Sequence, residues 1–248
     1  MSEADTAPGY LEDFRVGQCR RWQVPAAATA GRPAASAAFD MAFDVIGDGG
    51  TPVDLRWTFG DAGKPGDTTL TGTVTRCRFG AEGTGLVHRH LRLTDRADTV
   101  LGEGTAVFSF PAKHSEPLTQ HVRTDFCSLP WARELADALT RNEEFVSATR
   151  PMDGSIAFRC GDEAVQFRIY KGLVVDVARS TPSGPTFTVA GSELSWLGLM
   201  TAPRNDFIAR TMAGDFAASG NTHEYLRFTK AVVSAWDCVR ELARRDTP

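Results

Sequence analysis

Paired cysteines are missing from this sequence of 248 residues. Its five cysteines are scattered, and none belongs to a C-x-x-C pair; they are Cys19, Cys77, Cys127, Cys160 and Cys238. This spacing argues against a structural zinc site and against a disulfide framework, so we expect free thiols in a reducing compartment. The sequence predicts no metal site and no cofactor.

Basic blocks and long apolar runs are also missing. The formal net charge is -4, which gives no electrostatic footprint for a nucleic acid. No stretch approaches the roughly eighteen apolar residues of a transmembrane helix, and no basic amphipathic helix is found. The opening MSEADTAPGY is unlike a secretory signal, and the ending RRDTP is unlike the simplest peroxisomal signal. We therefore expect a cytoplasmic protein with no nucleic-acid partner and no stable membrane insertion.

Composition and length indicate two globular domains. Hydrophobic residues make up 42% of the chain and charged residues 23%, as in ordinary globular proteins. The segment PAKHSEPLTQHVRTD, residues 111–125, carries two prolines and little apolar content. We expect a linker at 113–125 between a domain at 1–112 and a domain at 126–248.

The first domain reads as an antiparallel sheet with a short helix. Apolar and polar residues alternate in three successive segments, 68–78, 86–94 and 99–110, separated by turns rich in Gly and Asp. Short connections of this kind predict an antiparallel meander. Two earlier strands are expected at 18–24 and 54–59. The Ala-rich segment 34–46 is expected to supply the helix, although its pattern also fits a strand.

The second domain mixes helices with a sheet. We expect helices at 131–145, 192–200, 205–212 and 222–244, and strands at 154–160, 164–170, 173–178 and 186–190. Ser192 is a suitable N-cap for the second of these helices, with Glu193 in its first turn. The sequence therefore predicts an α+β fold of two domains, with the helices of the second domain covering an antiparallel sheet.

Three segments of the second domain resemble the sterol carrier protein 2 domain. They are DGSIAFRCGDEAVQFRIYKGLVVDVA, TFTVAGSELSWLGLM and ARTMAGDFAASGN. The match includes the expected helix SELSWLGLM at Ser192–Met200 and the late glycines Gly214 and Gly220. The resemblance implies an apolar tunnel between a curved sheet and its helices. Such a tunnel accepts fatty acyl chains, fatty acyl-CoA or sterols without chemistry of its own.

Ten large apolar side chains are expected to turn inward and line this tunnel. They are Phe158, Phe167, Ile169, Val175, Phe187, Trp196, Leu197, Met200, Phe207 and Met212. Methionine adapts to varied shapes, which suits a pocket for varied chains. Residues of this kind also make dry cores, and only the family resemblance favours the tunnel.

The first domain resembles the MaoC-like dehydratases and R-specific enoyl-CoA hydratases. The segments that carry the resemblance are YLEDFRVGQ at 10–18, KPGDT at 64–68 followed by TLTGTVT, and the final GEGTAVFSF. The resemblance implies a hotdog fold over residues 9–111. It also implies a homodimer, or a heteromer with an active hotdog subunit or another acyl-thioester enzyme.

One departure from these hydratases concerns catalysis. They carry an Asp and a His a few positions apart between the first strand and the helix, where the pair holds water and moves a proton. Here the stretch 25–35 contains neither residue. No catalytic residue is therefore assigned, and a lyase activity of the hydratase or dehydratase type is left open.

Other polar groups have ordinary explanations. His88 and His90 share a strand face and suggest either a metal or proton site or solvated side chains. Asp40 and Asp44 suggest either an acid–base pair or a solvated helix face. The glycines of GAEGTG at 80–85 join two strands and open no helix, so they form a hairpin turn and not a phosphate loop. Ser195 lies in no Gly-x-Ser-x-Gly motif.

Three hypotheses follow for function. The order of the two domains resembles the C-terminal part of the type 2 peroxisomal multifunctional enzymes, which implies acyl-CoA or steroid-CoA metabolism. The first hypothesis is a lipid or acyl-thioester carrier whose hotdog half serves dimerisation or docking. The second is a dehydratase, hydratase or cyclase with a rebuilt site, and the third is a structural subunit of a multienzyme complex.

Overall fold

The computed structural model describes residues 9–24, 49–60, 67–80 and 83–244. The chain divides into two compact units, Met1–Leu118 and Thr119–Pro248. The division falls inside the segment 113–125 assigned as a linker, although the end of this segment is a helix, α2 (Thr119–Thr124). None of the described helices is both long enough and apolar enough to cross a membrane.

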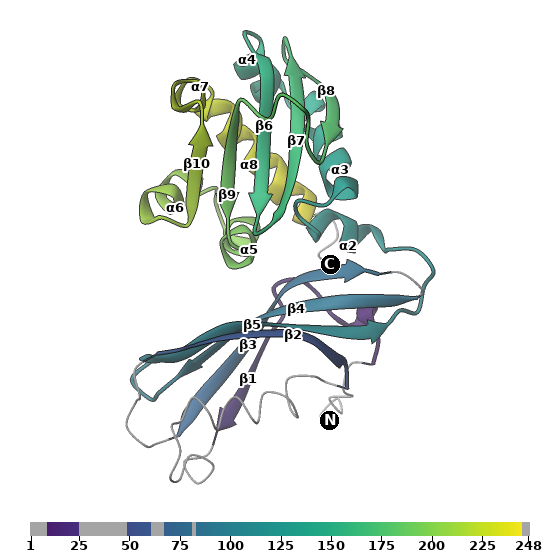
Figure 1. The fold of residues 1–248 in the computed structure, drawn as a ribbon, viewed down its shortest axis with the longest axis vertical. Helices are drawn as coiled ribbons and strands as arrows, with labels where there is room; N and C mark the ends of the chain where they lie inside the picture. Colours follow the sequence, from purple (N-terminus) through teal and green to yellow (C-terminus); the bar gives the residue numbers. More distant parts are fainter. Residues whose placement is uncertain (1–8, 25–48, 61–66, 81–82, 245–248) are drawn as a thin grey trace. The chain divides into compact units, whose positions relative to one another are not determined.

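The first unit is a five-stranded antiparallel sheet (Figure 1). Its elements are the 3-10 helix η1 (Leu11–Asp13) and the strands β1 (Cys19–Val24), β2 (Thr51–Phe59), β3 (Thr68–Phe79), β4 (Thr84–Thr94) and β5 (Val100–Pro111). The strand order is β1-β3-β4-β5-β2, which confirms the meander predicted for β3, β4 and β5. The helix expected at 34–46, with Asp40 and Asp44, lies outside the described residues, as do the stretch 25–35 and the turn at 64–66.

The two faces of this sheet differ sharply. One face is apolar and buried; its residues are Leu70, Val74, Cys77, Val87, Leu91, Leu93, Ala106, Phe108 and Phe110, joined by Leu11 and Phe14 from the N-terminal segment. Because side chains alternate along a strand, the residues between these point to the opposite face. That face is polar, and in β4 and β5 it includes His88, His90, Glu103 and Thr105.

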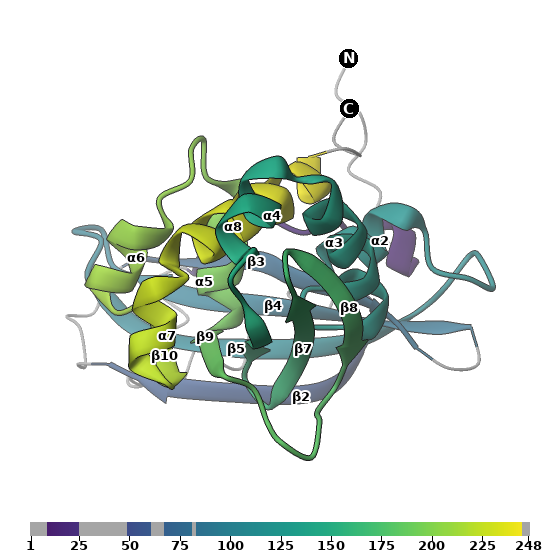
Figure 2. The ribbon, with the colours of Figure 1, turned by 90° about the horizontal axis from the view of Figure 1, so that it is seen from above.

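The second unit is a sheet covered by helices. Its strands are β6 (Asp153–Cys160), β7 (Glu163–Tyr170), β8 (Leu173–Ala178), β9 (Phe187–Gly191) and β10 (Phe216–Gly220). Its helices are α3 (Leu129–Arg141), α4 (Glu143–Thr149), α5 (Glu193–Thr201), α6 (Phe207–Ala213), α7 (Thr222–Arg227) and α8 (Thr229–Arg244), besides α2. Figures 1 and 2 show α3, α4 and α8 on the same face of this sheet. The α+β class is confirmed.

Three details of the second unit differ from the predictions. The helix expected at 131–145 is two helices, because Asn142 takes an extended conformation and caps α4. The helix expected at 222–244 is likewise divided at Phe228 into α7 and α8. The strand β10 was not predicted, and the sheet is not wholly antiparallel, since β6 and β9 are parallel. Both strand features depend on contacts distant in sequence, which alternation alone does not specify.

Candidate functional site

The helix α5 carries its tryptophan into the interior of the second unit. The Ser192 hydroxyl accepts a hydrogen bond from the Ser195 N–H at 3.1 Å, which confirms the predicted N-cap. Trp196 follows in the first turn of the helix and is fully buried. Its indole N–H donates to the Arg159 carbonyl oxygen on β6 at 3.2 Å, which fixes the orientation of the ring.

Trp196 lies at the centre of a set of contacting aromatic rings, called the aromatic cluster below. Its members are Phe126, Trp131, Phe158, Phe167, Trp196, Phe207, Phe216 and Trp236. The ring centroids of Trp196 and Trp236 are 4.6 Å apart, and those of Trp196 and Phe126 are 5.6 Å apart with nearly parallel planes. The sheet, α3, α5, α6 and α8 all contribute rings, so the cluster joins the sheet to its covering helices.

Two indole N–H groups in this cluster have no partner among the described residues. They belong to Trp131 and Trp236, which are both fully buried. A buried donor without an acceptor costs about 1–3 kcal/mol. These two groups are therefore places where an internal acceptor would stabilise the unit.

Eight of the ten residues predicted to line a tunnel are buried in this unit. They are Phe158, Phe167, Ile169, Phe187, Trp196, Leu197, Met200 and Phe207. Val175 and Met212, 55% and 85% exposed, do not face inward as expected. In β8 a register shift leaves Val175 unpaired beside Arg168 and Ile169, which breaks the alternation assumed for this strand. Met212 lies five residues after the buried Phe207 in α6, about 140° around the helix.

Four exposed apolar side chains lie on the three short helices α5, α6 and α7. Leu194 on α5, Ile208 and Met212 on α6 and Leu226 on α7 are each at least 40% exposed. These helices adjoin the β9 and β10 side of the sheet. Figure 1 shows α5 and α6 at one end of β9 and β10 and α7 at the other end, so Leu226 is separated from the other three side chains.

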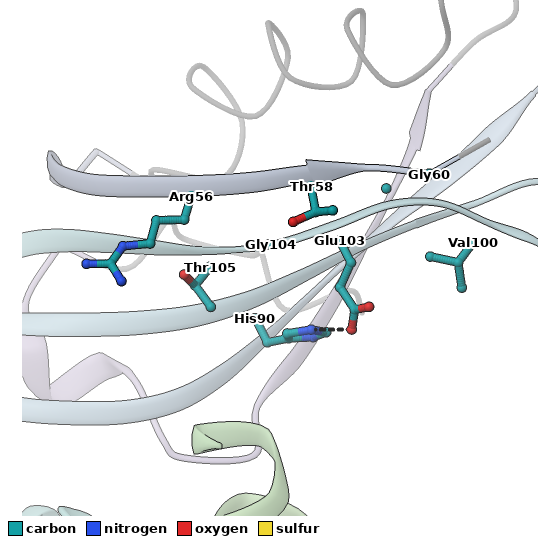
Figure 3. A pocket seen from close by; sticks show the side chains of 9 residues that line it. Arg56, Thr58, Gly60, His90, Val100, Glu103, Gly104 and Thr105 are labelled. Atoms are coloured by element: carbon teal, nitrogen blue, oxygen red, sulfur yellow. Dashed lines mark hydrogen bonds and ion pairs between the residues drawn. The ribbon is translucent and has the colours of Figure 1, made fainter. Parts of the chain in front are cut away.

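The polar face of the first unit holds a groove of about 490 Å³ (Figure 3). Its lining residues are Arg56, Thr58, Gly60, His90, Val100, Gly102, Glu103, Gly104 and Thr105. The strand register explains why these residues lie together on one face. His90, Thr105 and Arg56 are directly paired across β4, β5 and β2, and Glu103 and Thr58 are paired in the neighbouring row. Directly paired residues point to one face, so two rows of polar side chains form the lining.

Glycines hold the strands of this groove close together. A Cβ atom at Gly102 would lie 2.6 Å from the ring of Trp57, and one at Gly104 would lie 2.1 Å from the Arg56 carbonyl oxygen. Trp57 packs across both glycines on the apolar face of the sheet. A side chain at position 104 would therefore clash with the backbone of β2, and one at position 102 would force Trp57 to move.

A hydrogen-bonded pair, His90 and Glu103, lies in the groove. The His90 Nε2 atom is 2.7 Å from the Glu103 Oε1 atom, as Figure 3 shows by a dashed line. The two residues are diagonal neighbours on adjacent strands, since Glu103 is opposite Arg92 and His90 is opposite Thr105. Arg56 pairs at 3.1 Å with Asp54 on its own strand.

The sequence analysis named His90 but missed Glu103. The turn expected between the segments 86–94 and 99–110 already brings β4 against β5, and the alternation places both residues on the polar face. This pairing and alternation could have indicated from the sequence that Glu103 lies near His90. Among the described residues, no group of three or more His, Cys, Asp or Glu side chains is placed to hold a metal ion.

No protein-family model and no curated protein matches the chain. Among solved structures, sterol carrier protein 2 is 16% identical with a TM-score of 0.41, covering 47% of this chain and 98% of its own. A MaoC-like dehydratase from Rhodospirillum rubrum is 16% identical with a TM-score of 0.35, covering 44% of this chain and 99% of its own. A MaoC domain dehydratase from Chloroflexus aurantiacus is 20% identical with a TM-score of 0.39, covering 46% of this chain and 44% of its own. The chain thus has structural neighbours of both kinds, each over about half of its length.

Proposed function

We propose that this protein binds a lipid, in the form of a fatty acyl-CoA, a steroid-CoA or a sterol, inside its second unit. The first unit serves dimerisation or docking in acyl-thioester metabolism. The proposal is carried by Trp196, the tryptophan of the Ser192–Met200 motif, which lies at the centre of the aromatic cluster between the sheet and the helices. The resemblance of that motif to the sterol carrier protein 2 domain supplies the expectation of a lipid at this place.

The unpartnered indole groups support a ligand with a polar end. The N–H groups of Trp131 and Trp236 are buried without an acceptor among the described residues, so packing alone does not use these two polar groups. A lipid carbonyl, hydroxyl or carboxylate oxygen would accept from either group. Relief of each unmade hydrogen bond is worth about 1–3 kcal/mol.

The packing of the aromatic cluster sets a condition on entry. Because the rings are in contact, an acyl chain enters only when some rings change rotamer or a short helix moves. The exposed apolar side chains Leu194, Ile208 and Met212 lie on α5 and α6, at the same end of the sheet, so we expect entry beside these two helices. Burial of ten methylenes contributes about 8 kcal/mol before ordering costs, enough for micromolar binding.

Titration with palmitoyl-CoA tests this proposal, with tryptophan fluorescence and native mass spectrometry of the full chain as readouts. Three of the five tryptophans lie in the aromatic cluster, so ligand entry is expected to change the emission. Replacement of Trp196 by alanine is expected to weaken binding by about 1–3 kcal/mol. Trp196→Phe keeps a ring at this position and separates lost contacts from lost folding.

Val175→Ala is the matched control. The side chain lies on the same sheet but is exposed at the β8 bulge, so binding is expected to be unchanged. A protein that carries no lipid when purified and does not bind palmitoyl-CoA or cholesterol contradicts the proposal. The structural-subunit hypothesis would then take its place.

A further inference from the structure

The groove of the first unit contains a histidine that is hydrogen-bonded to a carboxylate. Glu103 Oε1 lies 2.7 Å from the Nε2 atom of His90, so the carboxylate accepts from the imidazole when the ring carries its proton at Nε2. In that tautomer the lone pair is on Nδ1, which then accepts a proton from a substrate. A histidine oriented by a carboxylate is the arrangement by which many enzymes move protons.

The other groups of the groove are suited to a carbonyl substrate. Figure 3 shows the hydroxyl-bearing side chains of Thr58 and Thr105 on the same side of the sheet as His90 and Glu103, with Arg56 beyond them. Hydroxyl and guanidinium donors stabilise negative charge on an oxygen. The volume of about 490 Å³ falls in the range of sites for small molecules.

We propose that His90 and Glu103 form a proton-transfer dyad that acts on the α-carbon of an acyl thioester bound in this groove. The choice of substrate class rests on the function proposed above. His90 Nδ1 takes a proton from the α-carbon. The C–H electron pair forms a double bond to the carbonyl carbon, and the carbonyl π pair moves to the oxygen as an enolate. The reverse step returns a proton from Nδ1 to the α-carbon, so no oxidant or other reactant is consumed.

The stretch 25–35 contains neither Asp nor His, and in this proposal His90 and Glu103 take the role of that missing pair. Glu103 stabilises the imidazolium that forms, and the donors of Thr58, Thr105 and Arg56 stabilise the enolate oxygen. The dyad lies on the polar face of the sheet, opposite the apolar core. His88, two residues earlier on the same face of β4, does not line the groove and has no part in the reaction.

Exchange of the α-hydrogens of octanoyl-CoA in D2O, followed by NMR and mass spectrometry, tests the dyad in the full chain. The wild-type protein is expected to incorporate deuterium at the α-carbon. His90→Gln is expected to lower the rate about 100-fold or more. Glu103→Gln keeps a hydrogen-bond partner without the charge and is expected to lower the rate about tenfold or more. His88→Gln is the matched control and is expected to exchange at the wild-type rate.

Folding and binding are measured beside the exchange rate. Glu103 is half-exposed and a hydrogen bond to an exposed carboxylate contributes little to stability, so Glu103→Gln is expected to keep the wild-type Tm. Octanoyl-CoA that binds without exchanging overturns the dyad and leaves the lipid-binding proposal standing. Exchange that persists in His90→Gln overturns the dyad as well. Trp196→Ala is expected to weaken palmitoyl-CoA binding and to keep α-hydrogen exchange. This result would show that the lipid site and the dyad are separate sites.

Discussion

At the scale of single residues, the start and end of the first sheet are joined by a charged contact. The Lys113 ammonium is 2.6 Å from Asp13 Oδ1, and the Glu12 carboxylate accepts from the backbone N–H groups of Lys113 and His114 at 2.9–3.1 Å. The hydrogen bond from Lys113 holds the pKa of Asp13 below its ordinary value. Burial opposes ionisation of Glu12, yet the two backbone donors still lower its pKa.

The lowered pKa of Asp13 makes its contribution dependent on pH. A depressed carboxyl pKa stabilises the fold above the unfolded-state pKa, and this stability is lost as pH falls through the folded-state value. Asp13→Asn is expected to lower the free energy of unfolding by about 0.5–1 kcal/mol at neutral pH, a value reduced by solvent screening. The difference from wild type should vanish in acid.

Urea unfolding at several pH values between about 7 and about 2 checks this expectation. Glu116→Gln, an exposed acid on the following segment, serves as the control and is expected to follow the wild-type profile. A deficit of Asp13→Asn that stays constant down to the lowest pH would show that its cause is not the ionised carboxylate.

At the scale of helices, Asn142 connects two elements of the second unit. Its side-chain oxygen accepts from the Phe145 N–H at 2.8 Å, which caps α4, and from the Ser234 hydroxyl of α8 at 2.9 Å. Ser234 is buried. Loss of the Asn142 oxygen therefore removes a helix cap and leaves a buried hydroxyl without this acceptor.

Asn142→Ala is expected to lower the free energy of unfolding by about 1–3 kcal/mol. Asn142→Asp keeps an acceptor and is expected to lose less. Asn221→Ala removes the exposed cap of α7, whose oxygen accepts from the Glu224 N–H at 3.1 Å, and is expected to cost about 1 kcal/mol or less. Chemical denaturation of the three variants compares these values; equal losses at Asn142 and Asn221 would argue against the second role of Asn142.

At the scale of the whole molecule, one edge of the first sheet is a candidate surface for the association proposed above. Among the strands that the structure describes, β2 is at the end of the order, and its Val53 and Phe59 side chains are 57% and 59% exposed. An exposed strand edge with apolar side chains is a template for pairing with another chain. This edge is therefore our candidate for the dimer or docking surface proposed for the first unit.

Phe59→Asp is expected to shift the protein from dimer to monomer at micromolar concentration, because a charge at this edge must be buried in the dimer. Size-exclusion chromatography with light scattering over a concentration series measures the shift. Leu173→Asp, on the edge strand β8 of the second sheet and 51% exposed, is the control. A wild-type protein that is monomeric at every concentration would refute self-association through β2.

The sequence by itself determined features that depend on neighbours along the chain. Alternation and short turns specified β3, β4 and β5 and their antiparallel order, because hairpins form between adjacent segments. The capping residue Ser192 specified the start of α5, because a cap acts within one turn. The two-unit α+β architecture followed from the same local patterns.

Only the tertiary structure decided features that depend on exact strand register. The parallel pairing of β6 with β9 joins segments that are distant along the chain. The exposure of Val175 and the meeting of His90 with Glu103 depend on the exact register within two hairpins, β7–β8 and β4–β5. A shift of one residue in register moves a side chain to the other face of a sheet, and local propensity does not fix that register. The aromatic cluster is assembled from the sheet and four helices that are distant along the chain. Its ring contacts therefore could not be predicted from local sequence patterns.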